Sequence, residues 1–243
     1  MAIGVNATRH PGRAGATAPP PRADLTGHAA FAVLATFVLL LGALVVAGIG
    51  SGALPGVTDR FVPARVAENI AVLTADATVQ LFMGTALIVM AVCLGRYLGT
   101  DGLVGWLAMI AGVVGGAAFV AAGAIQQETV FYAVFVDSEQ AGALASASGT
   151  SDLTGMNLMI SVVAGGMRSA GSYAFGLAWI GWAIIGARSG QLPRPLSAMG
   201  IIAGLGFALT NWIGPLAGPF AFFGSLIWLA GLAIVLYRRS RVT

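Results

Sequence analysis

Polar side chains within otherwise apolar segments are the residues of this chain that could do chemistry. Asp76 and Gln80 are four residues apart, as are Arg168 and Ser172, so each pair lies on one face of a predicted helix. Asp76 and Arg168 each precede by 20 residues an arginine at the far end of the same apolar segment. At about 1.5 Å per helical residue, both charges lie about 30 Å from those arginines. We therefore predict that Asp76 and Arg168 meet near one edge of the hydrocarbon as a hydrogen-bonded ion pair.

An internal repeat relates the two polar pairs. A shift of 92 residues places Asp76 and Gln80 on the second pair and gives eight identities over residues 84–112. Transporters are often built from repeats, with the binding site at the repeat interface. Two alternatives stay open. The repeat can reflect only the glycine- and alanine-rich composition of two hairpins, and the polar residues can be ordinary interface residues whose polar ends reach water. The candidate ligand-binding residues of an outward-facing polar pocket are Asp76, Gln80, Arg168, Ser172 and, at similar depth, Asn211.

The composition excludes several classes of protein. Of 243 residues, 58% are hydrophobic and only 9% are charged, whereas soluble domains carry about 25% charged residues. All 12 basic residues are arginine, which excludes lysine Schiff-base and P-loop phosphate chemistry. Both histidines precede the first apolar segment, and the chain has one cysteine. We therefore expect no metal site, no haem and no other cofactor within the apolar segments.

Long uncharged runs predict an all-α integral membrane bundle, because a spanning helix needs about 20 apolar residues. Six spanning helices are expected at 29–50, 75–97, 103–125, 168–188, 195–213 and 219–237. Residues 153–167 are too few to span, so we predict an extra interfacial or re-entrant helix there, within the outer connection 126–167. The predicted domains are a disordered cytoplasmic tail at 1–28, the transmembrane domain at 29–238 and a cytoplasmic C-terminus at 239–243.

Arginine placement predicts the orientation and the partners. With six spans, nine of the 12 arginines fall on the side of the two termini, and seven of the nine acidic residues fall on the opposite side. By the positive-inside rule, both termini are then cytoplasmic. Arg238, Arg239 and Arg241 are expected to attract anionic lipid rather than nucleic acid. Small-residue pairs such as Gly112 and Gly116 allow close helix packing within the chain or, alternatively, in a homo-oligomer.

The order of these elements resembles a known family. An alanine-rich charged segment at 64–70 precedes the second predicted span, and the turn after the fourth reads Ser189-Gly190-Gln191-Leu192-Pro193-Arg194. This pattern resembles the bacterial six-span membrane family known as domain of unknown function 4386, over roughly residues 30–237. The resemblance implies a six-span architecture in the bacterial inner membrane, and because the family has no established activity or catalytic residues, it implies no mechanism. The chain departs from the family at 111–116, where the family commonly places an arginine and an acid within the third span.

Three classes of function are compatible with these residues. We expect a non-enzymatic membrane protein that binds or moves a small molecule through an outward-facing polar pocket. The alternatives are an accessory or scaffold subunit and, as a third class, an intramembrane enzyme that acts on a lipid-soluble substrate. The enzyme would need Asp76 or Glu128 as an acid held in the membrane, and neither has a second acid within one helix turn.

Overall fold

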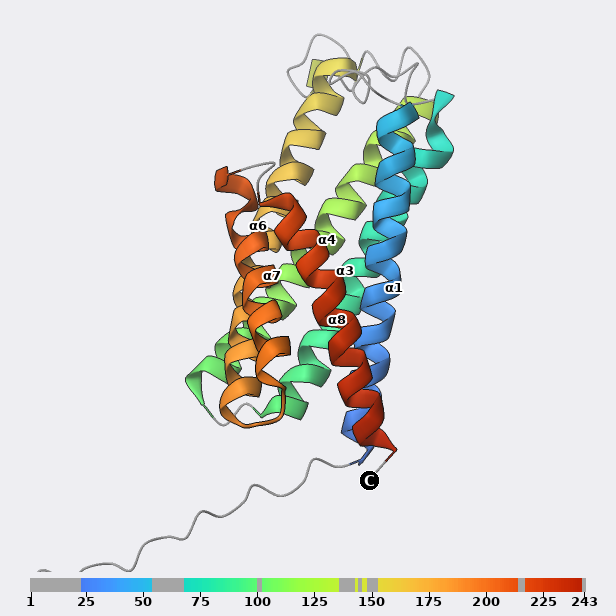
Figure 1. Cartoon of the computed structure of the whole chain (residues 1–243). Coiled ribbons are helices and arrows are strands. Elements are labelled where there is room, and N and C mark those ends of the chain that lie inside the picture. Colours follow the sequence, from blue (N-terminus) through green and yellow to red (C-terminus); the bar gives the residue numbers. More distant parts are fainter. Residues whose placement is uncertain are drawn as a thin grey trace, which may run out of the picture.

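The computed structural model describes residues 23–53, 68–99, 102–135, 143, 146–147, 153–213 and 217–241. In this part of the chain, the regular structure is α-helical (Figure 1). The long helices are α1 (Ala23–Ala53), α3 (Ile70–Leu98), α4 (Leu103–Phe135), α6 (Leu153–Arg188), α7 (Arg194–Ile213) and α8 (Gly218–Ser240). Within the described residues, five helices are long and apolar enough to cross a membrane, and α7 adds a shorter apolar stretch, Arg194–Thr210. The predicted class, an all-helical chain with membrane-spanning segments, is confirmed at this level.

Several helices extend beyond the predicted spans. The helix α1 begins at Ala23, before the predicted start at residue 29, and α4 continues to Phe135 rather than ending at residue 125. Residues 1–22, most of the predicted tail, lie outside the described residues. Apolar runs therefore locate each helix, whereas its ends lie in flanking turns that the runs do not include.

The helix α6 differs from the prediction, because Leu153–Arg188 forms one continuous helix of 36 residues. The segment 153–167, predicted as a separate interfacial or re-entrant helix, is instead the first part of α6. Arg168 interrupts the apolar run, but a charge does not end a helix, and the segment contains no proline that would break one. At about 54 Å, α6 exceeds the hydrocarbon thickness of about 30 Å, so part of it must project beyond the lipid.

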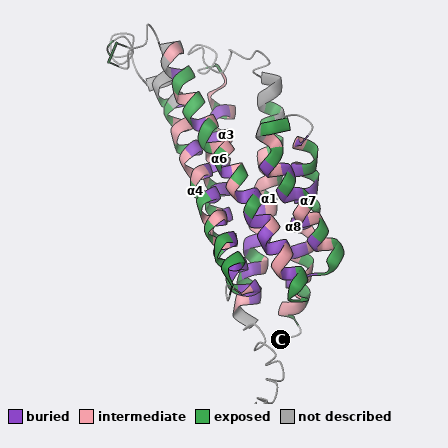
Figure 2. Cartoon of the chain, turned by 90° about the vertical axis from the view of Figure 1, so that its left-hand side faces the viewer, coloured by how far each residue is buried: buried purple, intermediate pink, exposed green. Residues whose placement is uncertain are grey.

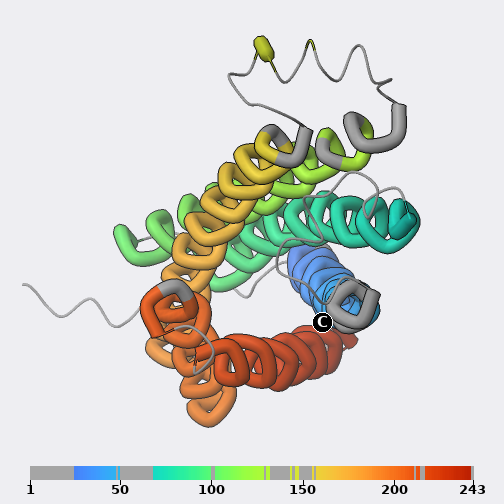
Figure 3. Tube along the Cα trace, turned by 90° about the horizontal axis from the view of Figure 1, so that it is seen from above, coloured from blue at the N-terminus to red at the C-terminus, as the bar shows by residue number. Residues whose placement is uncertain are grey.

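The long helices form a closed ring. Each packs against the next one along the chain, and α1 packs against α8 to close the ring (Figure 3). Buried and exposed residues alternate along the same helices, so each helix has an inner and an outer face (Figure 2). Large apolar residues such as Phe31, Trp212 and Phe223 are exposed, as expected of a surface that contacts lipid. The start of α1 and the end of α8 lie at the same end of the bundle (Figure 1).

Facing glycines bring two pairs of helices into close contact. A Cβ atom built on Gly84 of α3 would lie 2.7 Å from the carbonyl oxygen of Gly116 of α4, and the reverse distance is also 2.7 Å. Gly176 of α6 and Gly204 of α7 face each other in the same way, at 2.5 and 2.6 Å. Only a residue without a side chain fits at these backbone contacts, as in other small-residue helix crossings. The two hairpins of the predicted repeat thus share one mode of packing.

The structure corrects the register of that repeat. The facing glycines are 32 residues apart in the first hairpin (84 to 116) and 28 apart in the second (176 to 204). The gap-free shift of 92 residues therefore matches α3 with α6 but sets α4 out of register with α7 by about one helical turn. Gly112, which that shift places on Gly204, packs against Ala91 and Trp182 instead.

Candidate functional site

Gln126 of α4 lies at the centre of a polar cluster that joins α3, α4 and α6. Its Nε2 donates a hydrogen bond to Asp76 Oδ2 at 3.0 Å, and its Oε1 accepts one from Gln80 Nε2 at 3.1 Å. Arg168 Nη2 donates to Gln126 Oε1 at 2.8 Å and to Gln80 Oε1 at 2.9 Å. Gln80 is buried and the other three side chains are half-buried. We call Asp76, Gln80, Gln126 and Arg168 the amide-bridged cluster.

The described contacts link Asp76 and Arg168 through Gln126 rather than through the predicted direct ion pair. Among the hydrogen bonds of the described residues, the carboxylate and the guanidinium are connected through the side-chain amide of Gln126. An amide carries both donors and an acceptor, so it can serve the carboxylate with its NH2 and the guanidinium with its oxygen at once. The helix α4 lies between α3 and α6 in the ring, which places its amide between the two charges.

Three of the five predicted site residues meet in one hydrogen-bonded cluster. Asp76, Gln80 and Arg168 belong to the amide-bridged cluster, as described above. The hydroxyl of Ser172 donates to the backbone carbonyl of Arg168 at 2.9 Å, within α6. The side chain of Asn211 lies outside the part of the structure that is described. The central member of the cluster, Gln126, was not among the predicted site residues.

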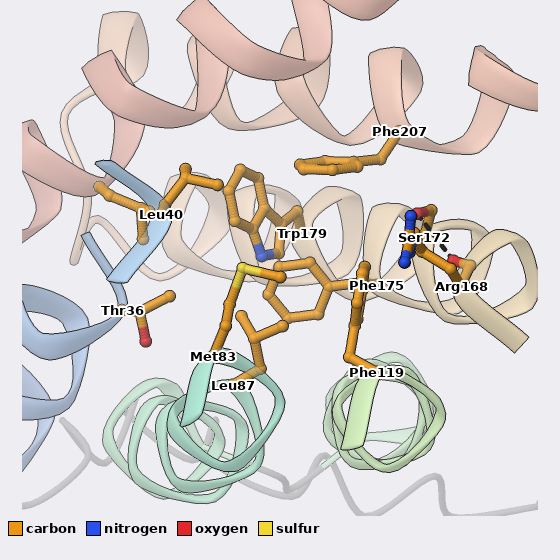
Figure 4. Close-up of a pocket in the computed structure, with 11 residues that line it drawn as sticks. Thr36, Leu40, Met83, Leu87, Phe119, Arg168, Ser172, Phe175, Trp179 and Phe207 are labelled. Atoms are coloured by element: carbon orange, nitrogen blue, oxygen red, sulfur yellow. Dashed lines mark hydrogen bonds between the residues drawn. The ribbon is translucent and has the colours of Figure 1, made fainter. Parts of the chain in front are cut away.

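A cavity of about 150 Å³ lies inside the ring, next to the amide-bridged cluster. The predicted site residues belong to three of the predicted spans, whereas this cavity takes side chains from all the long helices of the ring. Its lining consists of Thr36 and Leu40 of α1, Met83 and Leu87 of α3, Phe119 of α4, Arg168, Ser172, Phe175 and Trp179 of α6, Phe207 of α7 and Leu229 of α8 (Figure 4).

The cavity has a charged end and a mainly apolar end. Arg168 and Ser172 lie together at one end, beside Phe119 and Phe207, whereas Trp179 lies farther along, toward α1 (Figure 4). The indole of Trp179 meets the ring of Phe207 edge to face, with centroids 5.4 Å apart. Arg168 belongs both to this cavity and to the amide-bridged cluster. The arrangement could therefore hold a small molecule that has an apolar body and one polar group.

The spacing along α6 explains why one helix supplies so much of the lining. Arg168, Ser172, Phe175 and Trp179 are separated by four, three and four residues, which places them on a single face of the helix. That periodicity is visible in the sequence, and it could have added Phe175 and Trp179 to the predicted site. Among aromatic residues in an apolar helix, however, such spacing is equally typical of ordinary core packing.

Neither metal binding nor similarity to known proteins assigns a function to the cluster or the cavity. Within the described residues, no group of three His, Cys, Asp or Glu side chains could hold a metal ion. Comparisons with protein-family models, curated proteins and solved structures find no match. The cluster and the cavity are therefore interpreted from their own geometry.

Proposed function

We propose that this chain is a bacterial inner-membrane protein with six spanning helices that binds or moves a small molecule through an outward-facing polar pocket. The common end of the bundle for the start of α1 and the end of α8 supports an even number of crossings (Figure 1). The arginine bias supports cytoplasmic termini. In this proposal α7 is the sixth span. The proposal also includes membership of the family known as domain of unknown function 4386, which the chain resembles in sequence.

The observation that carries the proposal is the cavity at the centre of the ring, with a charged residue at one end. Protein interiors are normally close-packed, so a space of about 150 Å³ shared by all the long helices is unusual for a purely structural bundle. A charged side chain within a membrane segment is costly and usually faces a bundle interior or a water-filled cavity where it has a function. Arg168 combines both features, because it lines the cavity and is hydrogen-bonded to the cluster.

An accessory or scaffold role is the second possibility. Gly84, Gly116, Gly176 and Gly204 pack against helices of the same chain and cannot contact other subunits, whereas Gly165 and Gly166 of α6 have open space at the Cβ position and could do so. An intramembrane enzyme would need an acid held in the membrane, whereas the carboxylate of Asp76 accepts a hydrogen bond from Gln126 and Glu128, the other candidate, is exposed.

We also propose that the end of α8 attracts anionic lipid through its arginines. Arg238 and Arg241 are exposed, and Arg239 Nη1 donates to the hydroxyl of Tyr97 at 2.7 Å. Arg241 lies over the ring of Tyr237, 4.6 Å from its centroid. Clustered arginines at the cytoplasmic surface gain about 1 kcal/mol each from anionic lipid, so a role in anchoring this end of the bundle follows.

Thiol labelling from outside the cell tests whether the pocket faces outward. Ser172→Cys, on a Cys93→Ala background, should react in intact cells with a membrane-impermeant thiol reagent, because this position lines the charged end of the cavity. Ser225→Cys is the matched control, since Ser225 is buried on α8 and does not line the cavity. Equal protection of the two variants would contradict an outward-facing pocket.

A further inference from the structure

We propose that the central cavity binds a monocyclic aromatic carboxylate, with the ring between the aromatic side chains and the carboxylate at Arg168. This inference rests on the proposed function, because it assumes that the cavity holds a small molecule. It adds the charge, the size and the chemical class of that molecule. Each of the three follows from a different observation.

The sign of the charge follows from which charged residues line the cavity. Of the described residues in its lining, Arg168 is the one that carries a charge. Asp76, the acid of the amide-bridged cluster, is not part of the lining and is hydrogen-bonded to the amide of Gln126. Among the described residues, a ligand in the cavity therefore meets a guanidinium and no carboxylate. Charge-assisted hydrogen bonds to a guanidinium favour a carboxylate ligand, and the apolar surroundings strengthen them.

The size of the ligand follows from the volume of the cavity. A space of about 150 Å³ matches the size of apolar protein cavities that bind one benzene molecule. A long acyl chain or a polycyclic ligand would need a larger space or a movement of the helices. The cavity therefore selects a single ring or a molecule of similar volume.

The aromatic character follows from the side chains around the space. Phe119, Phe175, Trp179 and Phe207 all line it, together with the thioether of Met83. The ring centroids of Phe175 and Trp179 are 5.0 Å apart, and the ring planes are inclined at 63°. The aromatic wall of the cavity therefore offers ring edges as well as ring faces to a ligand. Aromatic rings prefer such edge-to-face contacts, and thioethers add favourable contacts with ring edges. A planar ring therefore gains more here than an alkyl group of equal volume.

Benzoate is the probe that combines these features. Full-length protein in nanodiscs of zwitterionic lipid would be titrated calorimetrically with benzoate, benzyl alcohol, hexanoate and acetate, with empty nanodiscs subtracted. Benzyl alcohol keeps the ring without the charge, hexanoate keeps the charge without the ring, and acetate keeps only the carboxylate. We expect benzoate to bind about tenfold more tightly than each of the other three.

Two substitutions locate the charge recognition. Arg168→Gln should weaken benzoate by about tenfold and change benzyl alcohol by less than about threefold, because only the carboxylate loses its partner. Arg168→Lys should keep most of the affinity for benzoate, since it keeps the positive charge. Arg96→Gln is the matched control, because Arg96 is exposed at the cytoplasmic end of α3 and does not line the cavity.

The outcomes separate this inference from the proposed function. If benzyl alcohol binds as tightly as benzoate, the cavity takes small molecules but does not select an anion, and only the inference fails. If hexanoate binds as tightly as benzoate, the aromatic part of the inference fails. If none of the four probes binds the wild-type protein, the inference is overturned, while the labelling of Ser172→Cys still decides whether the pocket faces outward. Because the four probes are compared on wild-type protein, the test does not depend on the folding of any variant.

Discussion

Replacing Gln126 with leucine should destabilise the bundle far more than the same change at its neighbour Gln127. Gln126 connects three partners on two other helices, at 3.0 Å to Asp76, 2.8 Å to Arg168 and 3.1 Å to Gln80. Gln127 makes one long hydrogen bond, to the hydroxyl of Thr78 at 3.5 Å. The two residues have the same side chain and the same half-buried environment, so Gln127→Leu is a matched control.

The magnitude follows from the kinds of hydrogen bond that are lost. Bonds to charged groups contribute about 1.5–3 kcal/mol each and neutral ones about 0.5–1.5 kcal/mol. Gln126 makes two of the first kind and one of the second. Because Asp76 and Arg168 are only half-buried, water can replace part of what they lose. We therefore expect Gln126→Leu to lower the free energy of unfolding by about 2–4 kcal/mol, and Gln127→Leu by less than about 1 kcal/mol.

The assay is equilibrium unfolding of the purified protein in mixed micelles, with denaturing detergent as the titrant and far-UV circular dichroism as the readout. The double variant Gln126→Leu with Asp76→Asn adds a second test. If Gln126 holds the carboxylate, the double variant should lose clearly less stability than the two single variants together. Equal losses for Gln126→Leu and Gln127→Leu, or additive losses in the double variant, would refute the bridging role.

Three further predictions concern packing, topology and the tail. Gly84→Ala should cost about 1–3 kcal/mol of stability in the same unfolding assay, because its methyl group would meet backbone atoms of α4 at 2.7 Å. Gly42→Ala should be neutral or slightly stabilising, since nothing lies within 4 Å, and equal effects of the two changes would contradict the close crossing. On a cysteine-free background, Ser148→Cys should react with an impermeant thiol reagent in intact cells and Gly190→Cys should not, whereas the reverse pattern would overturn the orientation. Deletion of residues 3–22 should leave membrane insertion unchanged in a fractionation assay, and loss of insertion would reveal a structural role for this segment.

The sequence alone was sufficient to locate the helices, apart from the continuity of α6, and to place polar residues on the faces of two of them. Uncharged runs located each long helix, because lipid admits a backbone segment only when its hydrogen bonds are satisfied internally, and an apolar helix achieves this locally. The four-residue spacing from Asp76 to Gln80 and from Arg168 to Ser172 likewise depends only on the helical period. The predicted cluster of polar residues is therefore found where the two faces approach each other, although with a different hydrogen-bonding pattern.

Only the tertiary structure decided which faces meet and in what register. Gln126 bridges to Asp76 and Arg168 across sequence separations of 50 and 42 residues. The one-turn offset between the two glycine crossings, the continuity of α6 and the composition of the cavity lining were also not predicted from the sequence. Periodicity describes the faces within one helix, whereas the rotation and axial position of that helix depend on side-chain contacts with every neighbour in the ring. Such contacts are a property of all the helices together, so no single segment of the sequence contains them.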